Sequence, residues 1–187
     1  MISYIAFVKS FLMNPLRVGA LVPSSPYLAE KMADLADFSG AKCVVEFGSG
    51  TGSVTKKILR RLPEDCVLLS FEIEKSFAER LKKSFNDKRL IVINDSAEQL
   101  AKYLKKYGYK RADCVISCLP LASLPNGTTK RILEAAKEFL KNGGYYIQIQ
   151  YSLNDFNNLK KVFSNVRLGF EIRNFPPAFI YICEKNI

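Results

Sequence analysis

The sequence predicts an α/β protein in which helices cover both faces of a mostly parallel sheet. Short apolar runs rich in β-branched residues alternate along the chain with stretches whose apolar residues recur at helical spacing. The apolar runs are continuous rather than alternating, which indicates strands that are buried on both faces. The length of 187 residues suits one domain, and a composition of 48% hydrophobic and 25% charged residues suits a folded core.

The predicted elements follow one another in a regular order. Seven apolar, β-rich runs are predicted as strands, at residues 43–45, 66–72, 90–93, 114–118, 145–150, 166–173 and 178–183. Amphipathic stretches between them are predicted as helices, at residues 53–61, 75–85, 97–107 and 130–140, with a fifth at 155–163. Only a short Asn-Phe-Pro-Pro turn separates the last two strands, so we expect them to pair antiparallel.

The charge balance indicates an anionic partner. Lysine and arginine total 28 and aspartate and glutamate total 18, which gives a net charge of +10. Such a surplus suits nucleic acid, a phospholipid surface or a phosphorylated ligand, and it does not choose among them. The chain contains no histidine, which excludes Ser-His-Asp and Cys-His nucleophiles and the common catalytic zinc sites.

The five cysteines do not form a Cys-x-x-Cys pair. Four of them lie inside apolar, β-like runs, namely Cys43, Cys66, Cys114 and Cys183. We interpret these four as small core side chains of a protein from a reducing compartment rather than as a metal or redox site. Cys118 differs from them, because it lies in a motif that is described below.

The N-terminal segment stands apart from the alternating pattern. Residues 2–14 project as an amphipathic helix with Phe7 and Phe11 on its apolar side, and Pro15 is expected to end it. The pattern leaves two interpretations open, a helix that packs over the domain core and a membrane-surface helix that acts as a substrate lid. No apolar window reaches the length of a membrane span, and the first residues lack the features of a secretory signal.

The most informative motif is a glycine-rich loop that follows the first predicted strand. The strand ends near Glu46, and glycines recur at every second position over residues 48–52. Glycines let the backbone approach a ligand closely, and the helix that follows offers unpaired N–H groups. Ser53 stands where a dinucleotide fingerprint needs glycine, and Glu72 ends a second strand 20 residues later, where a carboxylate can accept ribose hydroxyls. Glu46 suits the cationic methionine end of S-adenosylmethionine better than a pyrophosphate, so we expect S-adenosylmethionine rather than NAD.

These motifs resemble those of the class I S-adenosylmethionine-dependent methyltransferases. Residues 46–52 are similar to the first motif of that family, residues 71–73 to its acidic ribose-binding strand end, and residues 94–97 to its third motif, in which an acid takes the adenine amino group. The cofactor-binding residues that the resemblance implies are Glu46, Gly48, Ser49, Gly50, Thr51, Gly52, Glu72, Ile73, Asp95, Ser96 and Ser117.

The same resemblance implies a Rossmann-like, seven-stranded, mostly parallel sheet with an antiparallel last strand and helices on both faces. It covers the chain after about residue 37. Residues 1–187 are therefore expected to form a single methyltransferase domain, in which residues 1–37 are a helical, membrane-facing lid. S-adenosylmethionine is the cofactor that the family uses, and no metal is implied.

Three further blocks resemble the bacterial phospholipid N-methyltransferases, which convert phosphatidylethanolamine stepwise to phosphatidylcholine. They are residues 14–25, 117–125 and 173–178. This resemblance implies a cytoplasmic enzyme at the inner face of the membrane, with an anionic lipid surface as its partner and a phospholipid head group as its substrate. The substrate contacts are assigned to Ser24, Ser25, Leu119, Pro120 and Tyr151, of which Tyr151 follows the fifth strand at the edge where open α/β sheets bind ligands. The first and third blocks also have a simpler interpretation, as a helix cap and a hairpin turn.

The chemistry needs no covalent nucleophile, because methyl transfer is an in-line displacement that mainly requires positioning and desolvation. The attacking amine must lose a proton first, and Tyr27, Tyr151 and bulk water are the candidate acceptors. An RNA adenine N-methyltransferase, similar to the rRNA dimethyladenosine transferases, is the alternative function. Residues 117–121 lack the amide and the aromatic ring that such enzymes present to a base, so nucleic acid is less expected as a partner. A cofactor-binding module that serves a partner protein is the third hypothesis.

Overall fold

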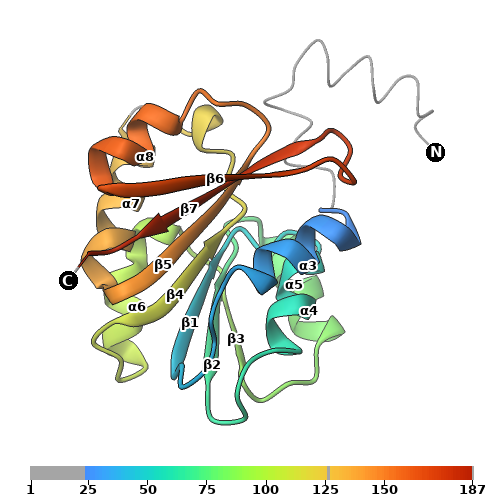
Figure 1. The fold of residues 1–187 in the computed structure, drawn as a ribbon. Helices are drawn as coiled ribbons and strands as arrows, with labels where there is room; N and C mark the ends of the chain where they lie inside the picture. Colours follow the sequence, from blue (N-terminus) through green and yellow to red (C-terminus); the bar gives the residue numbers. More distant parts are fainter. Residues whose placement is uncertain (1–23, 126, 187) are drawn as a thin grey trace.

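The computed structural model describes residues 24–125 and 127–186, so the helix predicted at residues 2–14 lies outside the described residues (Figure 1). The described elements are, in order, α3 (Pro26–Asp34), β1 (Cys43–Phe47), α4 (Ser53–Leu59), β2 (Val67–Phe71), α5 (Lys75–Ser84), β3 (Leu90–Ile93), the 3₁₀ turn η1 (Ala97–Gln99), α6 (Leu100–Lys106), β4 (Ala112–Ser117), the 3₁₀ turn η2 (Leu121–Ser123), α7 (Thr128–Phe139), β5 (Leu140–Gln150), α8 (Phe156–Val162), β6 (Asn165–Glu171) and β7 (Ala178–Glu184).

The strands form one seven-stranded sheet in the order β3-β2-β1-β4-β5-β7-β6. All neighbouring pairs from β3 to β5 are parallel, whereas β7 runs antiparallel to both β5 and β6. The predicted fold class is therefore confirmed, including the reversed last strand and the antiparallel pairing of the final two strands. The chain reverses its direction of travel across the sheet between β1 and β4, and ligands of such sheets bind at the carboxyl ends of the strands beside that point.

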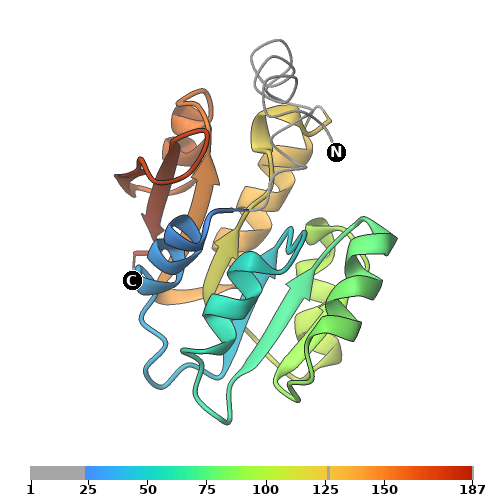
Figure 2. The ribbon, with the colours of Figure 1, turned by 90° about the vertical axis from the view of Figure 1, so that its right-hand side faces the viewer.

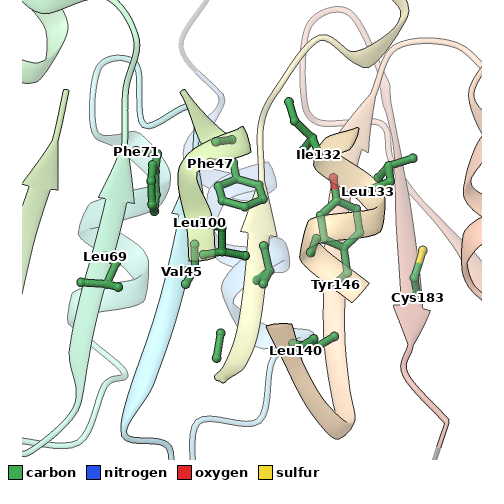
Figure 3. Packing of buried hydrophobic residues seen from close by; sticks show 14 of the residues in the cluster. Val45, Phe47, Leu69, Phe71, Leu100, Ile132, Leu133, Leu140, Tyr146 and Cys183 are labelled. Atoms are coloured by element: carbon green, nitrogen blue, oxygen red, sulfur yellow. The ribbon is translucent and has the colours of Figure 1, made fainter. Parts of the chain in front are cut away.

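Helices cover both faces of the sheet (Figures 1 and 2). On one face, α6, α7 and α8 bury a cluster that includes Leu100, Leu133 and Leu159 against the strands, and Figure 3 shows this packing around Phe47, Phe71 and Tyr146. On the other face, α3 and α4 bury a second cluster. Each large apolar side chain that leaves water in this way contributes roughly 1.5–3 kcal/mol, and the two clusters together hold the strand ends in place.

Most element boundaries differ from the sequence prediction by one or two residues, and the following differences bear most on the fold. The helix predicted at residues 97–107 is divided into η1 and α6, because the Ser96 hydroxyl accepts from the Glu98 amide and starts a tight turn. The helix predicted at 53–61 ends at Leu59. The helix predicted at 130–140 ends at Phe139, and β5 begins at Leu140 instead of residue 145. Leu140 is fully buried and pairs with Ala112 across an irregularity in the β4–β5 ladder, so core packing extends this strand.

The four cysteines that were predicted to lie in the core are buried there, and none forms a disulfide. They are Cys43, Cys66, Cys114 and Cys183. Burial raises the pKa of these thiols, to about 12 for Cys43 and Cys183, so they remain protonated at neutral pH. Among residues 24–125 and 127–186, no helix combines the length and the apolar character that crossing a membrane requires.

Candidate active site

The glycine loop joins β1 to α4 in a conformation that requires glycine. Gly48 has φ +73° and Gly52 has φ +84°, a region that other residues rarely adopt. A β-carbon on Gly48 would lie 3.0 Å from Cδ2 of Leu119, and one on Gly52 would lie 2.6 Å from Cδ1 of Leu81. The Gly48 amide donates to the carbonyl of Phe71 at 2.8 Å, which fixes the loop to the end of β2. The loop is thus a tight cradle at the carboxyl edge of the sheet.

Glu46 is fully buried beneath this loop. Its Oε2 accepts from the hydroxyls of Thr55 and Ser70, each at 2.7 Å, whereas its Oε1 has no hydrogen-bond partner. The hydroxyl of Ser49, also buried, lacks a partner too. Burial raises the pKa of Glu46 to about 7, against the lowering effect of the two hydroxyls. Two polar atoms without partners therefore lie at the loop, and such atoms are costly unless a ligand satisfies them.

Glu72 reaches from the end of β2 to the glycine loop. Its Oε2 accepts from the Gly50 amide at 2.8 Å and its Oε1 accepts from the Glu74 amide at 2.9 Å, and the residue is 7% exposed. Each carboxylate oxygen retains acceptor capacity beyond these bonds. The neighbouring Ile73 is 75% exposed. The side-chain amide of Asn94 holds this turn, because its Nδ2 donates to the backbone carbonyls of Glu72 and Ile73.

Asp95 follows β3 at the same edge of the sheet. One of its oxygens accepts from the Ser96 amide at 2.8 Å, and the other accepts from the Tyr103 hydroxyl at 2.9 Å and the Lys102 ammonium at 3.2 Å. These bonds, the Ser96 amide first, lower the pKa of Asp95. The carboxylate is therefore ionised at neutral pH and fixed in orientation, whereas the Ser96 hydroxyl is used to start η1.

The segment after β4 lies against the glycine loop. Ser117 is fully buried and its hydroxyl accepts from the Leu119 amide at 3.4 Å. The Cys118 amide donates to the carbonyl of Phe47 at 2.8 Å. The carbonyl of Leu119 accepts from the side-chain amides of Gln148 at 2.9 Å and of Gln150 at 3.4 Å. Two glutamines on β5 thus position the loop that carries Leu119 and the adjoining Pro120.

Asn174 connects the start of α3, the β6–β7 hairpin and Tyr151. It is 3% exposed, its Oδ1 accepts from the Ser25 amide at 2.8 Å, and its Nδ2 donates to the carbonyl of Pro176 at 2.7 Å. Its side chain also hydrogen-bonds Tyr151, whose pKa is raised because burial outweighs this bond. The Ser25 hydroxyl accepts from the Leu28 amide at 3.1 Å and caps α3. The helix cap expected at Ser25 is confirmed, and residues 14–23 of the same block lie outside the described residues.

Tyr27 lies in the first turn of α3 and is 53% exposed. The guanidinium of Arg173 is 4.5 Å from the centroid of its ring. Arg173 also donates from Nε to the Glu171 carboxylate at 3.0 Å, which is the main reason that the pKa of Glu171 falls to about 2. These contacts link Tyr27 to the β6–β7 hairpin rather than to the glycine loop.

The structure therefore brings the predicted residues together at one edge, in two neighbouring groups. The residues that adjoin the glycine loop are Glu46, Ser49, Glu72 and Ser117. The ends of β2 and β3 add Ile73, Asp95 and Ser96. The other side of the loop is closed by Leu119 and Pro120. Tyr151 and Ser25 meet Asn174 beyond β5, next to Ser24 and Tyr27. Sequence reasoning missed Thr55, Ser70, Gln148 and Asn174. The polar residues Ser70 and Gln148 inside apolar strand runs were the available signal.

This arrangement fits S-adenosylmethionine. The unpartnered Oε1 of Glu46 and hydroxyl of Ser49 offer acceptors for the ammonium of its methionine end, and a β-carbon on Gly48 would fill the cradle. Glu72 retains acceptor capacity for ribose hydroxyls. In the part of the chain that the structure describes, no group of three potential ligand side chains could hold a metal ion.

Comparison with known proteins agrees with this chemistry. The profile of a family described as a methyltransferase domain matches residues 44–144. The ornithine lipid N-methyltransferase of Singulisphaera acidiphila is 31% identical over 183 residues, which cover 97% of this chain and 95% of that protein. The ribosomal RNA small subunit methyltransferase H of Christiangramia forsetii is 26% identical over 145 residues, or 74% of this chain and 47% of that protein.

Solved structures show the same fold at low sequence identity. A putative rRNA methylase from Clostridium thermocellum superposes with a TM-score of 0.65 at 19% identity, covering 87% of this chain and 97% of that one. A 16S rRNA methyltransferase from T. thermophilus, solved with AdoMet and guanosine, gives a TM-score of 0.66 at 15% identity, covering 88% and 44%. With the matching profile and the full-length relative, these findings show that the chain belongs to the class I S-adenosylmethionine-dependent methyltransferases and uses S-adenosylmethionine as its cofactor.

Proposed function

We propose that this protein transfers methyl groups from S-adenosylmethionine to the amino group of a membrane lipid. The observation that carries the proposal is the match to an ornithine lipid N-methyltransferase over 97% of this chain and 95% of that relative. The ribosomal RNA methyltransferase H covers this chain less completely, and this chain spans only 47% of its length. Phosphatidylethanolamine and ornithine lipid both present an amine on a membrane-anchored head group, and either is a substrate of the proposed class.

The proposed cofactor contacts follow from the geometry of the site. We assign Glu46 and Ser49 to the methionine end, Glu72 to the ribose hydroxyls, and Asp95 with Ile73 to the adenine. Glu72 supports this role because it already joins β2 to the glycine loop through the Gly50 amide. Asp95 supports it because its carboxylate is ionised and held rigidly by Ser96 and Tyr103.

When bound, S-adenosylmethionine supplies an electrophilic methyl group on its sulfonium. The protein then has to hold the acceptor amine in line and exclude water. Leu119 and Pro120 suit this task because they are partly buried beside the glycine loop, and because Gln148 holds the Leu119 carbonyl at 2.9 Å. Tyr151, held by Asn174, is the proposed wall of the acceptor site on the β5 side.

The acceptor amine must be uncharged when it attacks. Burial raises the pKa of Tyr151, so its phenol stays protonated at neutral pH and cannot take the proton. We assign Tyr151 a hydrogen-bonding role toward the lipid head group. Tyr27, the other candidate, contacts Arg173 of the hairpin rather than the glycine loop, so bulk water is the proton acceptor that we propose. Burial also raises the pKa of the Cys118 thiol, which disfavours its nucleophilic thiolate form.

The alternative acceptor, an RNA adenine, receives less support from the site. The segment that starts at the last residue of β4 is Ser117-Cys118-Leu119-Pro120-Leu121, which offers neither a side-chain amide for the base edge nor an aromatic ring for stacking. Its apolar residues suit a lipid better than a nucleobase.

The test is to incubate the protein with labelled S-adenosylmethionine and, in separate reactions, phosphatidylethanolamine vesicles, ornithine lipid vesicles, phosphatidylcholine vesicles or total RNA. We expect label in the lipid extract of one or both amine lipids, and none with phosphatidylcholine, whose amine is already fully methylated. Glu72→Gln should lose this transfer, whereas Glu74→Gln, the same change at an exposed position two residues away, should retain it. Label confined to the RNA would contradict the proposal.

A further inference from the structure

Most of the large apolar side chains that are exposed in the described part of the chain lie near the β6–β7 hairpin. Leu153, Leu168, Phe170 and Ile172 belong to this group, and we call these four residues the hairpin face. Ile172 is 72% exposed, Leu153 is 49%, and Leu168 and Phe170 are each 46%. Exposed apolar residues gathered in this way indicate a binding surface rather than chance exposure.

The register of the strands explains why this face is uncovered. Val166, Leu168 and Phe170 point to the same side of β6, because side chains alternate along a strand. Val166 packs into the cluster beneath α8, and α8 runs back toward the amino end of β6, so it covers that end alone (Figure 1). Phe170 stands opposite Phe179, with ring centroids 5.1 Å apart, and forms the exposed continuation of the cluster.

Leu153 joins the same surface from the turn before α8. The hydroxyl of Tyr181 donates to the carbonyl of Ser152 at 3.0 Å, and Tyr181 is the strand partner of Leu168. The hairpin face therefore extends from the β5–α8 turn across β7 to the edge strand β6, at the carboxyl end of β5.

Every exposed charged side chain between residues 151 and 177 is basic. These residues are Lys160, Lys161, Arg167 and Arg173. The two acids in this span, Asp155 and Glu171, are each 3% exposed. The Lys160 ammonium lies 4.4 Å from the ring centroid of Phe156, so a cation borders the apolar surface directly. Lys160 and Lys161 belong to α8, which packs on the side of the sheet to which Leu168 and Phe170 point. Arg167 alternates with Leu168 and points to the other side, so the cations that border the hairpin face are the two lysines of α8.

We propose that the hairpin face is a docking surface for an anionic phospholipid bilayer. Apolar side chains edged by cations complement a membrane, in which anionic head groups lie over hydrocarbon. The hairpin also contributes Asn174, which bonds Tyr151 at the proposed acceptor site, so docking here brings that site to the membrane. The inference deepens and rests on the proposed lipid substrate.

The chain contains no tryptophan, so a single introduced tryptophan reports on this surface without background. We would make Phe170→Trp in the full chain and record its fluorescence with vesicles of phosphatidylethanolamine and phosphatidylglycerol. The expected results are a blue-shifted emission and quenching by lipids brominated along their acyl chains. Unchanged emission together with vesicle binding of the same protein would overturn the proposal, because the protein would then bind through another face.

The matched control is Tyr107→Trp. Tyr107 follows α6, on the side that leads into the amino end of β4, and the Lys106 ammonium lies 5.4 Å from its ring centroid. This position is therefore also aromatic and basic. Attraction by charge alone would bring both tryptophans to the membrane surface equally, whereas the proposal expects acyl-chain quenching at residue 170 and none at residue 107.

A double variant, Phe170→Ser with Ile172→Ser, separates docking from the proposed function. Both residues are exposed, so the fold should tolerate the change. We expect vesicle binding, and methylation of vesicle lipid, to fall by about tenfold or more, while methylation of a short-chain, monomeric amine lipid stays at the wild-type rate. Equal loss on both substrates, or no loss on vesicles, would contradict docking. Failure of the wild-type protein to methylate either lipid would refute the proposed function, and the tryptophan result would still decide docking.

Two other groups could occupy the hairpin face, a second copy of the chain or another part of the same chain. Light scattering of the wild type and the double variant tests the first. A wild-type dimer that the double variant converts to a monomer would assign the hairpin face to a second copy of the chain. An emission from Phe170→Trp that is already blue-shifted without vesicles, and that vesicles do not change, would indicate that this protein covers the face itself. Either result overturns the proposal.

Discussion

A buried carboxylate with one oxygen unpartnered lies beneath the glycine loop. Glu46 places Oε2 between the hydroxyls of Thr55 and Ser70, and its Oε1 has no partner. The contribution of Glu46 to the free energy of unfolding therefore depends on its protonation state and on whether a ligand at the loop binds Oε1. Glu72 differs, because both of its oxygens already accept backbone amides. Glu46 and Glu72 are thus prepared for different roles.

The first prediction at this scale concerns Glu72. Glu72→Ala removes a hydrogen-bonded carboxylate from the proposed ribose site, so cofactor affinity should fall by roughly 10- to 150-fold, or about 1.5–3 kcal/mol. Isothermal titration calorimetry measures this loss, with Glu74→Ala as the control. Unchanged affinity in Glu72→Ala would refute the ribose assignment.

The second prediction concerns the pH dependence that Glu46 imposes. Its folded pKa of about 7 lies above the ordinary value of 4.5, so the folded protein binds more protons than the unfolded chain between these values. The free energy of unfolding should therefore fall as pH rises from the ordinary value through 7, and level off above it.

The ammonium and sulfonium charges of bound S-adenosylmethionine would lower the pKa of Glu46, because a nearby positive charge favours the ionised carboxylate. Cofactor binding should then release a proton below about pH 7. Calorimetry in two buffers of different ionisation enthalpy measures the release. Glu46→Gln, which has the same shape and no titration, should abolish both effects. An unchanged pH slope of stability in Glu46→Gln would assign the slope to another group.

At the residue scale, spacing pointed to Glu46 and Glu72, whereas Asp95 was assigned only through the resemblance to the methyltransferase family. The glycine loop, Glu46 and Glu72 were predictable because each lies at a strand end in a recurrent order. Asn174 was not assigned to the site because its partners, Ser25 and Tyr151, come from distant parts of the chain. A hydrogen bond between residues that are far apart in the sequence leaves no local sequence pattern.

At the scale of elements, β5 supports the loop that follows β4. Gln148 is fully buried, accepts from the Tyr146 hydroxyl at 2.5 Å and donates to the Leu119 carbonyl at 2.9 Å. Gln150 donates to the same carbonyl at a longer 3.4 Å. The β5 strand therefore determines where Leu119 lies relative to Gly48.

We predict that Gln148→Leu leaves the Leu119 carbonyl and the Tyr146 hydroxyl without this partner. The free energy of unfolding should fall by about 1–3 kcal/mol. The turnover rate should fall by more than the cofactor affinity, because the loop borders the proposed acceptor site. Gln150→Leu, which removes one longer bond, is the control and should have a smaller effect on both. Equal effects of the two variants on turnover would contradict a positioning role for Gln148.

Element types were predictable from the sequence, whereas several boundaries were not. Apolar continuity and helical spacing indicated each of the seven strands and the helices after β1. The early start of β5 at Leu140 depends on pairing with Ala112, and the division of η1 from α6 depends on the Ser96 hydroxyl. Strand pairing in the folded protein and a single side-chain cap decide these two boundaries. Neither one alters the spacing of apolar residues, so the sequence pattern does not reveal them.

At the scale of the whole molecule, the positive surplus lies after residue 41, because the first 41 residues carry equal numbers of basic and acidic side chains. The sheet and its helices therefore carry the charge that would meet an anionic surface. We predict that vesicle binding rises with anionic lipid content and weakens with salt, at roughly 1 kcal/mol per basic residue held near the surface. Sedimentation measures it, and equal binding to neutral and anionic vesicles at low salt would contradict it.

The N-terminal segment provides a separate prediction, since residues 2–14 lie outside the described part of the chain. If they form a membrane lid, Phe7→Asp with Phe11→Asp should abolish vesicle binding and lipid methylation while the melting temperature stays near that of the wild type. The core-packing interpretation predicts a loss of about 3–5 kcal/mol of stability for each phenylalanine. A collapsed melting temperature would decide against the lid.

The central claim is that the site at the carboxyl edge methylates a lipid amine. Mass spectrometry of amine lipids after incubation with S-adenosylmethionine tests it most directly, because each transfer adds one CH₂ to the lipid mass. The account predicts heavier products with the wild type and with Glu74→Gln, none with Glu72→Gln, and none from phosphatidylcholine. Lipids of unchanged mass in a reaction that yields methylated adenine in added RNA would contradict it.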